Sequence, residues 1–122
     1  MTKVAIVEDD QAISQMYRIK FEAEGFDVET AANGKLGLAL AEEMRPDIIL
    51  LDLMMPVMTG EEMLAAMRQT SWGKDIKVII LTNSGEEQAP PELKTLGIRH
   101  YIVKAEMTPR QVAEMVKTEL TL

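Results

Sequence analysis

The sequence contains no cysteine, a single histidine and only five aromatic residues. Without cysteine there can be no disulfide bond and no thiolate metal site, and one histidine cannot form a histidine cluster around a metal. The reducing cytoplasm is therefore the simplest compartment for this chain. No apolar run is long enough to span a membrane, and Thr2 and Lys3 lead directly into a strand-like segment, without a signal-peptide pattern.

Positive charge is also scarce. There are 13 lysine and arginine residues against 20 aspartate and glutamate residues, which gives a net charge of −7. This balance disfavours direct binding to nucleic acid or to anionic lipid. The chain is nevertheless 47% hydrophobic over 122 residues, enough for one core and too short for two domains. We expect residues 1–122 to form one domain, with no separate output domain.

The most informative stretch is Ile48–Leu51, four large apolar residues that lead into Asp52. A short unbroken apolar run is typical of a strand that is buried on both faces of a parallel sheet. Pro56 ends any strand and begins a turn. Asp52 is therefore expected at the carboxyl end of a central strand, where open α/β folds bind their ligands.

The whole chain alternates between strand-like and helix-like segments. The expected strands are 4–7, 26–30, 48–52, 77–81 and 100–103, and the expected helices are 11–24, 34–44, about 60–68, a short one between 90 and 97, and about 109–120. This alternation predicts an α/β fold with five parallel strands and helices on both faces. The second strand alternates apolar and polar residues as an edge strand does, which favours the strand order 2-1-3-4-5.

Helix starts and buried faces can also be predicted. Asp10, Asn33, Thr59 and Thr108 precede helical segments as N-caps, the last two as capping boxes. Two rows of apolar residues have helical spacing and are expected to face the core; they are Ala12, Ile13, Met16, Tyr17 and Ile19, and Leu36, Leu40 and Met44.

Polar side chains stand at the ends of four of the five strands. The first strand delivers Glu8 and Asp9, the third Asp52, the fourth Thr82 and the fifth Lys104. Parallel strands end at one rim, so three carboxylates, a hydroxyl and an ammonium should converge there. Such a group of carboxylates needs a counter-charge, and oxygen ligands favour a hard ion such as Mg²⁺. An aspartate beside Mg²⁺, with a lysine and a hydroxyl near it, can become an aspartyl phosphate.

With these residues in view, the chain resembles over its whole length the receiver domain of two-component response regulators, of the single-domain, chemotaxis-regulator-like type. The matching residues are Glu8, Asp9, Asp52 with Met55, Pro56 and Gly60, Thr82, and Tyr101 three residues before Lys104. The resemblance implies a flavodoxin-like (βα)5 sandwich and a role in a phosphorelay. A sensor histidine kinase, or a phosphotransfer protein, would supply the phosphoryl group. The domain would not be an enzyme beyond catalysing its own phosphoryl transfer and autodephosphorylation.

The resemblance also implies roles for the acidic residues. Asp52 would be the phosphoacceptor, and Asp9 and Asp52 would bind Mg²⁺ directly. Glu8 would bind the ion mostly through water, and the main-chain carbonyl of Met54 would complete the protein ligands.

The other matching residues would act once the phosphoryl group is present. Lys104 would pair with one phosphoryl oxygen and Thr82 would move to bond another. Tyr101 would turn inward into the space that Thr82 leaves. The face formed by the fourth helix, fifth strand and fifth helix would then change its preference for protein partners, and a monomer could form a weak dimer through the same face.

The chain departs from the family pattern in two places. Lys104 is followed by Ala105 where the family usually has proline, so base rates favour a trans peptide bond. Pro90 and Pro91 should shorten the fourth helix.

Other interpretations of the same residues must be weighed. A haloacid-dehalogenase-type phosphatase uses a second aspartate two residues after the nucleophile, where this chain has Met54. A flavin-binding carrier of the same topology needs a phosphate loop after the first strand, where Glu8 and Asp9 would repel phosphate. A receiver that has lost phosphorylation is disfavoured by the intact acids, threonine and lysine. For Tyr101 the alternative is simple packing at the rim of the sheet, since an aromatic residue there needs no function.

Overall fold

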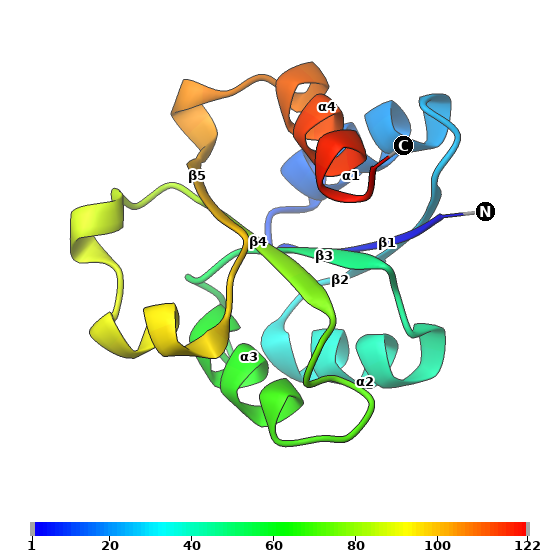
Figure 1. Cartoon of the computed structure of the whole chain (residues 1–122). Helices are drawn as coiled ribbons and strands as arrows, with labels where there is room; N and C mark the ends of the chain where they lie inside the picture. Colours follow the sequence, from blue (N-terminus) through cyan, green and yellow to red (C-terminus); the bar gives the residue numbers. More distant parts are fainter. Residues whose placement is uncertain (1, 122) are drawn as a thin grey trace.

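The computed structural model describes residues 2–121, apart from the side chain of Glu86. Its elements in chain order are β1 (Lys3–Val7), α1 (Gln11–Ala23), β2 (Asp27–Ala31), α2 (Gly34–Met44), β3 (Ile48–Leu51), α3 (Gly60–Arg68), β4 (Lys77–Thr82), the 3₁₀ helices η1 (Glu86–Gln88) and η2 (Pro91–Leu96), β5 (His100–Val103), the 3₁₀ helix η3 (Lys104–Glu106) and α4 (Pro109–Glu119). The strands form one parallel sheet in the order β2-β1-β3-β4-β5, which confirms the predicted fold. Helices α1 and α4 cover one face, and α2 and α3 the other (Figure 1).

The central strand β3 is buried on both faces, as its unbroken apolar run predicts. Ile48 and Leu50 belong to the core under α1 and α4, whereas Ile49 and Leu51 belong to the core over α2 and α3. Successive side chains of a strand point to opposite faces, so a strand between two helical layers needs an apolar residue at each position. Asp52 follows directly after this strand and is 6% exposed.

The expected helix caps are all present. The side chains of Asp10, Asn33, Thr59 and Thr108 each accept a backbone N–H from the first turn of the following helix, and the two threonines form complete capping boxes. The helix expected between 90 and 97 is the short 3₁₀ helix η2, which begins at Pro91 and ends at Leu96, with Gly97 as its C-cap. The two prolines therefore shorten this element, as predicted.

The predicted buried faces of α1 and α2 are partly wrong. Ala12 is exposed, and Met16, Ile19 and Leu36 are 46%, 61% and 53% exposed. Of the row predicted on α1, Tyr17 is buried as expected, and the helix also buries Ser14 and Phe21; α2 instead buries Gly34, Gly37 and Ala41. On α2 the small buried residues allow the helix to lie close to the sheet, so Leu36 turns outward, whereas on α1 the large Tyr17 and Phe21 fill the core and leave Met16 and Ile19 outside.

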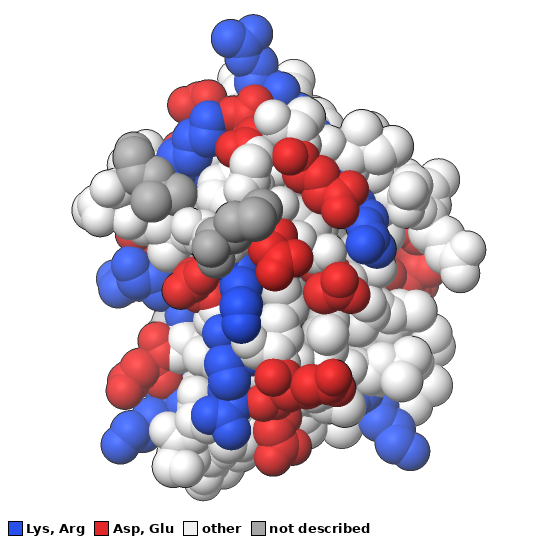
Figure 2. Space-filling view, turned by 90° about the vertical axis from the view of Figure 1, so that its right-hand side faces the viewer, with Lys and Arg blue, Asp and Glu red and all other residues white. Residues whose placement is uncertain are grey.

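Three further features bear on the predictions. There is no cis peptide bond among the described residues, so the Lys104–Ala105 bond is trans, as base rates favour. Within residues 2–121 we find no helix whose length and apolar character would let it cross a bilayer. The face shown in Figure 2 has acidic and basic side chains interspersed, without a large patch of one sign.

Arg68, the last residue of α3, holds together two loops at the amino end of the sheet. Its Nε donates to the carbonyl of Leu96 at 2.7 Å, and its Nη1 donates to the carbonyls of Gly73 and Ile76, both at 2.8 Å. Its Nη2 donates to the carbonyl of Gly97 at 3.3 Å. The planar guanidinium of Arg68 thus binds four carbonyls, two in the segment before β4 and two in the segment before β5. A lysine ammonium cannot do this.

Replacing Arg68 by lysine should therefore lower the free energy of unfolding by about 2 kcal/mol, because several partly buried carbonyls lose a charged donor. Urea denaturation measures the effect. Arg110→Lys, at an exposed position in the first turn of α4, is the matched control and should change stability little. Equal losses in the two variants would show that Arg68 contributes no more than a surface arginine.

Candidate functional site

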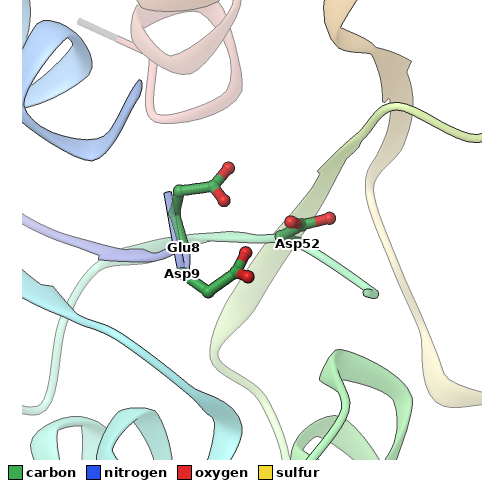
Figure 3. A group of neighbouring side chains, drawn as sticks. All are labelled: Glu8, Asp9 and Asp52. Carbon is green, nitrogen blue, oxygen red and sulfur yellow. The ribbon is translucent and has the colours of Figure 1, made fainter. Parts of the chain in front are cut away.

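Three carboxylates meet at the carboxyl end of the sheet. Glu8 and Asp9 follow β1 and Asp52 follows β3, and one carboxylate oxygen from each lies within 4.8 Å of the other two. Figure 3 shows the Glu8 and Asp9 side chains extending toward Asp52. Backbone hydrogen bonds continue the sheet at this point, since the Glu8 N–H donates to Ala31 and the Asp52 N–H donates to Val7, both at 3.0 Å. The sheet itself therefore positions these acids.

The carboxylates border a cleft of about 250 Å³, which we call the acidic cleft. Its lining consists of Glu8, Asp9, Asp10, Ile13, Asp52, Met54, Thr82, Asn83 and Lys104. Five of the residues predicted as site residues from strand ends are thus brought together. Asn83 was missed, although its position directly after Thr82 at the end of β4 could have indicated it.

Lys104 supplies the positive charge in this cleft. Its ammonium forms an ion pair with Glu8 and lies 3.4 Å from an Asp52 oxygen, and its side chain is only 9% exposed. Burial alone would lower the pKa of Lys104, but hydrogen bonding to Glu8 and the nearby charge of Asp52 outweigh this effect and raise it. Lys104 therefore stays charged and partly neutralises the acidic cluster.

Glu8 is the acid most affected by its surroundings. Burial raises its pKa to about 7, and the nearby charge of Asp52 adds to this effect, while hydrogen bonds from Lys104 and from the Asp10 N–H oppose it. One buried lysine does not fully compensate the buried carboxylates, so the metal-free cleft favours a proton on Glu8.

The raised pKa predicts how stability depends on pH without metal. Between pH 4.5, the ordinary pKa of this side chain, and about 7, the folded protein keeps a proton that the unfolded chain releases. The free energy of unfolding therefore falls as pH rises through this window. Glu8→Gln should match the unaltered protein near pH 4.5, but exceed its stability by about 2 to 3 kcal/mol at about pH 8 in a chelating buffer. The exposed Glu43→Gln should show no such pH-dependent difference, and a parallel response in both variants would contradict the assignment.

Thr82 presents a hydroxyl with no partner. The side chain is fully buried, and its Oγ1 has no hydrogen-bond partner among the described residues. A buried polar group without a partner costs free energy, so such a group needs an explanation. Its place in the lining of the acidic cleft suggests that a bound group can accept this hydrogen bond.

Of the two remaining predicted site residues, Met54 lies at the acidic cleft and Tyr101 lies outside it. Met54 lines the cleft, its side chain is 68% exposed, and its N–H lies 3.4 Å from an Asp52 oxygen. Tyr101 does not line the cleft; its hydroxyl donates to the carbonyls of Ser84 and Gly85, at 3.0 and 3.2 Å. Tyr101 therefore contacts the segment that directly follows Thr82 and Asn83, and not the acids themselves.

The donors in this cleft fit a hard divalent cation. All three acids offer oxygen, and Asp9 is exposed, so water can complete the coordination. The ammonium of Lys104 and the unpartnered hydroxyl of Thr82 lie beside the three acids. Both are suitable partners for the oxygens of a phosphoryl group. The observed donor set is therefore compatible with Mg²⁺ together with a phosphoryl group.

Comparisons with known proteins agree with this chemistry. Residues 4–117 match the profile of a family described as "Response regulator receiver domain". The chain is 35% identical over 115 residues to the phosphate regulon transcriptional regulatory protein PhoB of Rhizobium meliloti, covering 94% of this chain and 51% of that protein. Chemotaxis protein CheY4 of Vibrio cholerae superimposes with a TM-score of 0.88 at 35% identity, covering 97% of this chain and 98% of that one.

A second similar structure contains BeF3 and Mg²⁺. It is the CheX-CheY-BeF3-Mg complex from Borrelia burgdorferi, with a TM-score of 0.86, 27% identity, and coverage of 98% of this chain and 89% of that one. The chain spans about half the length of the curated relatives it matches.

Proposed function

Because this chain belongs to the response regulator receiver family, whose members are phosphorylation-switched signalling domains of two-component systems, we propose that Asp52 is its phosphoacceptor. The observation that carries this assignment is the unpartnered Thr82 hydroxyl, buried in the cleft that Asp52 and Lys104 also line. A phosphoryl group on Asp52 would supply the acceptor that Thr82 lacks.

The proposed reaction is a phosphoryl transfer from a phosphohistidine of a kinase or phosphotransfer protein. An Asp52 carboxylate oxygen attacks phosphorus, a P–O bond forms, and the P–N bond breaks. The bonding electron pair returns to the imidazole nitrogen of the donor. Mg²⁺, when bound, would neutralise charge on the transferring oxygens. Asp9 and Asp52 would hold the ion, with Glu8 acting mostly through water and the Met54 carbonyl completing the set.

Lys104 and Thr82 are proposed to hold the product. The Lys104 ammonium already lies 3.4 Å from Asp52, so it can pair with a phosphoryl oxygen without a large movement. The Thr82 hydroxyl would donate to another oxygen. Lys104 and Thr82 would thus speed the phosphorylation of Asp52, and water in the exposed cleft would later hydrolyse the acyl phosphate.

Tyr101 is proposed to pass this change to the surface. Its hydroxyl binds the carbonyls two and three residues beyond Thr82, so a movement of Thr82 shifts its hydrogen-bond acceptors. The phosphoryl group needs to favour the active arrangement by only a few kcal/mol to change its population. The surface around η2, β5 and α4 would then bind a protein partner differently. A cytoplasmic location, where such kinases act, is part of the same proposal.

The test is to find the labelled residue. The protein is incubated with acetyl phosphate, with and without Mg²⁺, and analysed as intact protein by mass spectrometry. We expect one phosphoryl group per chain, only with Mg²⁺, and borohydride reduction should place it on Asp52. Labelling at another residue, or labelling that does not depend on Mg²⁺, would contradict the proposal.

A further inference from the structure

Helix α2 is tied to the loop that follows Asp52. The Gly34 N–H, at the start of α2, donates to the carbonyl of Met58 at 3.0 Å. The first N–H groups of a helix have no acceptor within the helix. The Asn33 side chain accepts the Leu36 N–H. The Gly34 N–H instead binds the carbonyl of Met58, 24 residues further along the chain. We call the segment that contains Met58, residues 53–59 between β3 and α3, the 53–59 loop.

The 53–59 loop is strained and needs support. Val57 has a φ of 69°, and the Met58 N–H donates to the carbonyl of Pro56 at 2.7 Å, which makes a γ-turn with Val57 at its centre. A positive φ is unfavourable for a β-branched residue, and such strain persists only where the surroundings fix it. Two glycine N–H groups do so here: Gly60 donates to Leu53 at 3.1 Å, and Gly34 donates to Met58.

Only glycine fits at position 34. A Cβ there would lie 2.4 Å from the Met58 carbonyl oxygen and 2.9 Å from the Met58 carbonyl carbon. The obstacle is backbone, so it cannot move aside as a side chain can. Any residue larger than glycine must push Met58, and with it the 53–59 loop, away from α2.

We infer that Gly34 is a positioning residue for metal binding and phosphorylation, acting through the 53–59 loop. This inference rests on the proposed function, in which the Met54 carbonyl is a metal ligand. The same loop also carries the Met54 N–H, 3.4 Å from an Asp52 oxygen. Gly34 does not line the acidic cleft, yet it fixes the segment that supplies one ligand and contacts the phosphoacceptor.

The test compares two glycine-to-alanine variants that have similar clashes in different places. A Cβ at Gly73 would lie 2.6 Å from the Met67 carbonyl oxygen, in the loop between α3 and β4 at the opposite end of the sheet. Both variants should lose stability in urea denaturation. Calorimetric titration should show Mg²⁺ binding weakened about tenfold in Gly34→Ala, as for other residues that support metal ligands, and unchanged in Gly73→Ala. Equal Mg²⁺ affinities in the two variants would overturn the inference.

A second measurement uses only the unaltered protein, so it does not depend on whether a variant folds. If opening of the Gly34–Met58 hydrogen bond weakens Mg²⁺ binding, then bound Mg²⁺ must oppose that opening to the same degree. Saturating Mg²⁺ should therefore slow hydrogen exchange of the Gly34 amide more than that of Gly37, whose N–H donates to Asn33 in the same helix at 2.8 Å. Identical responses of the two amides would overturn the inference about Gly34 but leave the proposed function standing. Failure of the unaltered protein to bind Mg²⁺ would overturn the proposed function as well.

Discussion

Replacing Asp52 by asparagine is expected to reduce phosphorylation by acetyl phosphate to background while leaving the fold intact. The asparagine side chain is nearly the same size, but its amide cannot attack phosphorus to form a stable acyl phosphate. The fold should not suffer, because the negative charge of Asp52 raises the pKa of Glu8 in the metal-free cleft. Asp52→Asn should therefore be at least as stable as the unaltered protein in a chelating buffer. Intact-mass analysis measures the labelling, and urea denaturation measures the stability.

The matched control is Asp47→Asn. Asp47 is an exposed acid just before β3, at the opposite end of the strand that positions Asp52, and its carboxylate accepts the Lys3 N–H at 2.8 Å. This variant should be labelled like the unaltered protein. Persistent labelling of Asp52→Asn at the same stoichiometry would mean that another residue is the phosphoacceptor.

The features predicted correctly from the sequence depend on short stretches of chain. The run Ile48–Leu51 predicts a strand buried on both faces without knowledge of its neighbours. Caps such as Thr59 act within one helical turn. Because all parallel strands end at the same rim, the residues that follow them are brought together once the alternation of strands and helices is known. Local patterns were therefore sufficient to predict the meeting of Glu8, Asp52 and Lys104.

The features that sequence reasoning missed depend on contacts between distant segments. Met16 and Ile19 have the right spacing for a buried face, but Tyr17 and Phe21 occupy the core and turn them outward. Arg68 looks like an ordinary charged residue at a helix end until its four carbonyl acceptors are seen. The missing partner of Thr82 likewise cannot be predicted from sequence, because it depends on every atom around the hydroxyl.

The largest loss of stability is expected from Gly60→Ala. Gly60 begins α3, and a Cβ there would lie 2.1 Å from the carbonyl oxygen of Asp52 and 3.0 Å from the Leu53 Cα. Either α3, whose Met63 and Leu64 are fully buried, or the backbone of Asp52 must move. We expect the free energy of unfolding to fall by about 3 kcal/mol, measured by urea denaturation, because the clash is with backbone in a packed region. Phosphorylation should also slow, because Asp52 itself is displaced.

The comparison with Gly97→Ala separates a steric clash from backbone strain. Gly97 has a φ of 73°, but a Cβ there would meet nothing within 4 Å, so alanine should cost only about 1 kcal/mol for the unfavourable φ. Gly60 has no positive φ, and alanine is the better helix former by about 1 kcal/mol, so backbone preference alone would make Gly60→Ala stabilising. A large loss at Gly60 can therefore arise only from the clash with the backbone of Asp52 and Leu53. A gain in stability would show that α3 can move away from Asp52 at little cost, and that Gly60 is not needed to position Asp52.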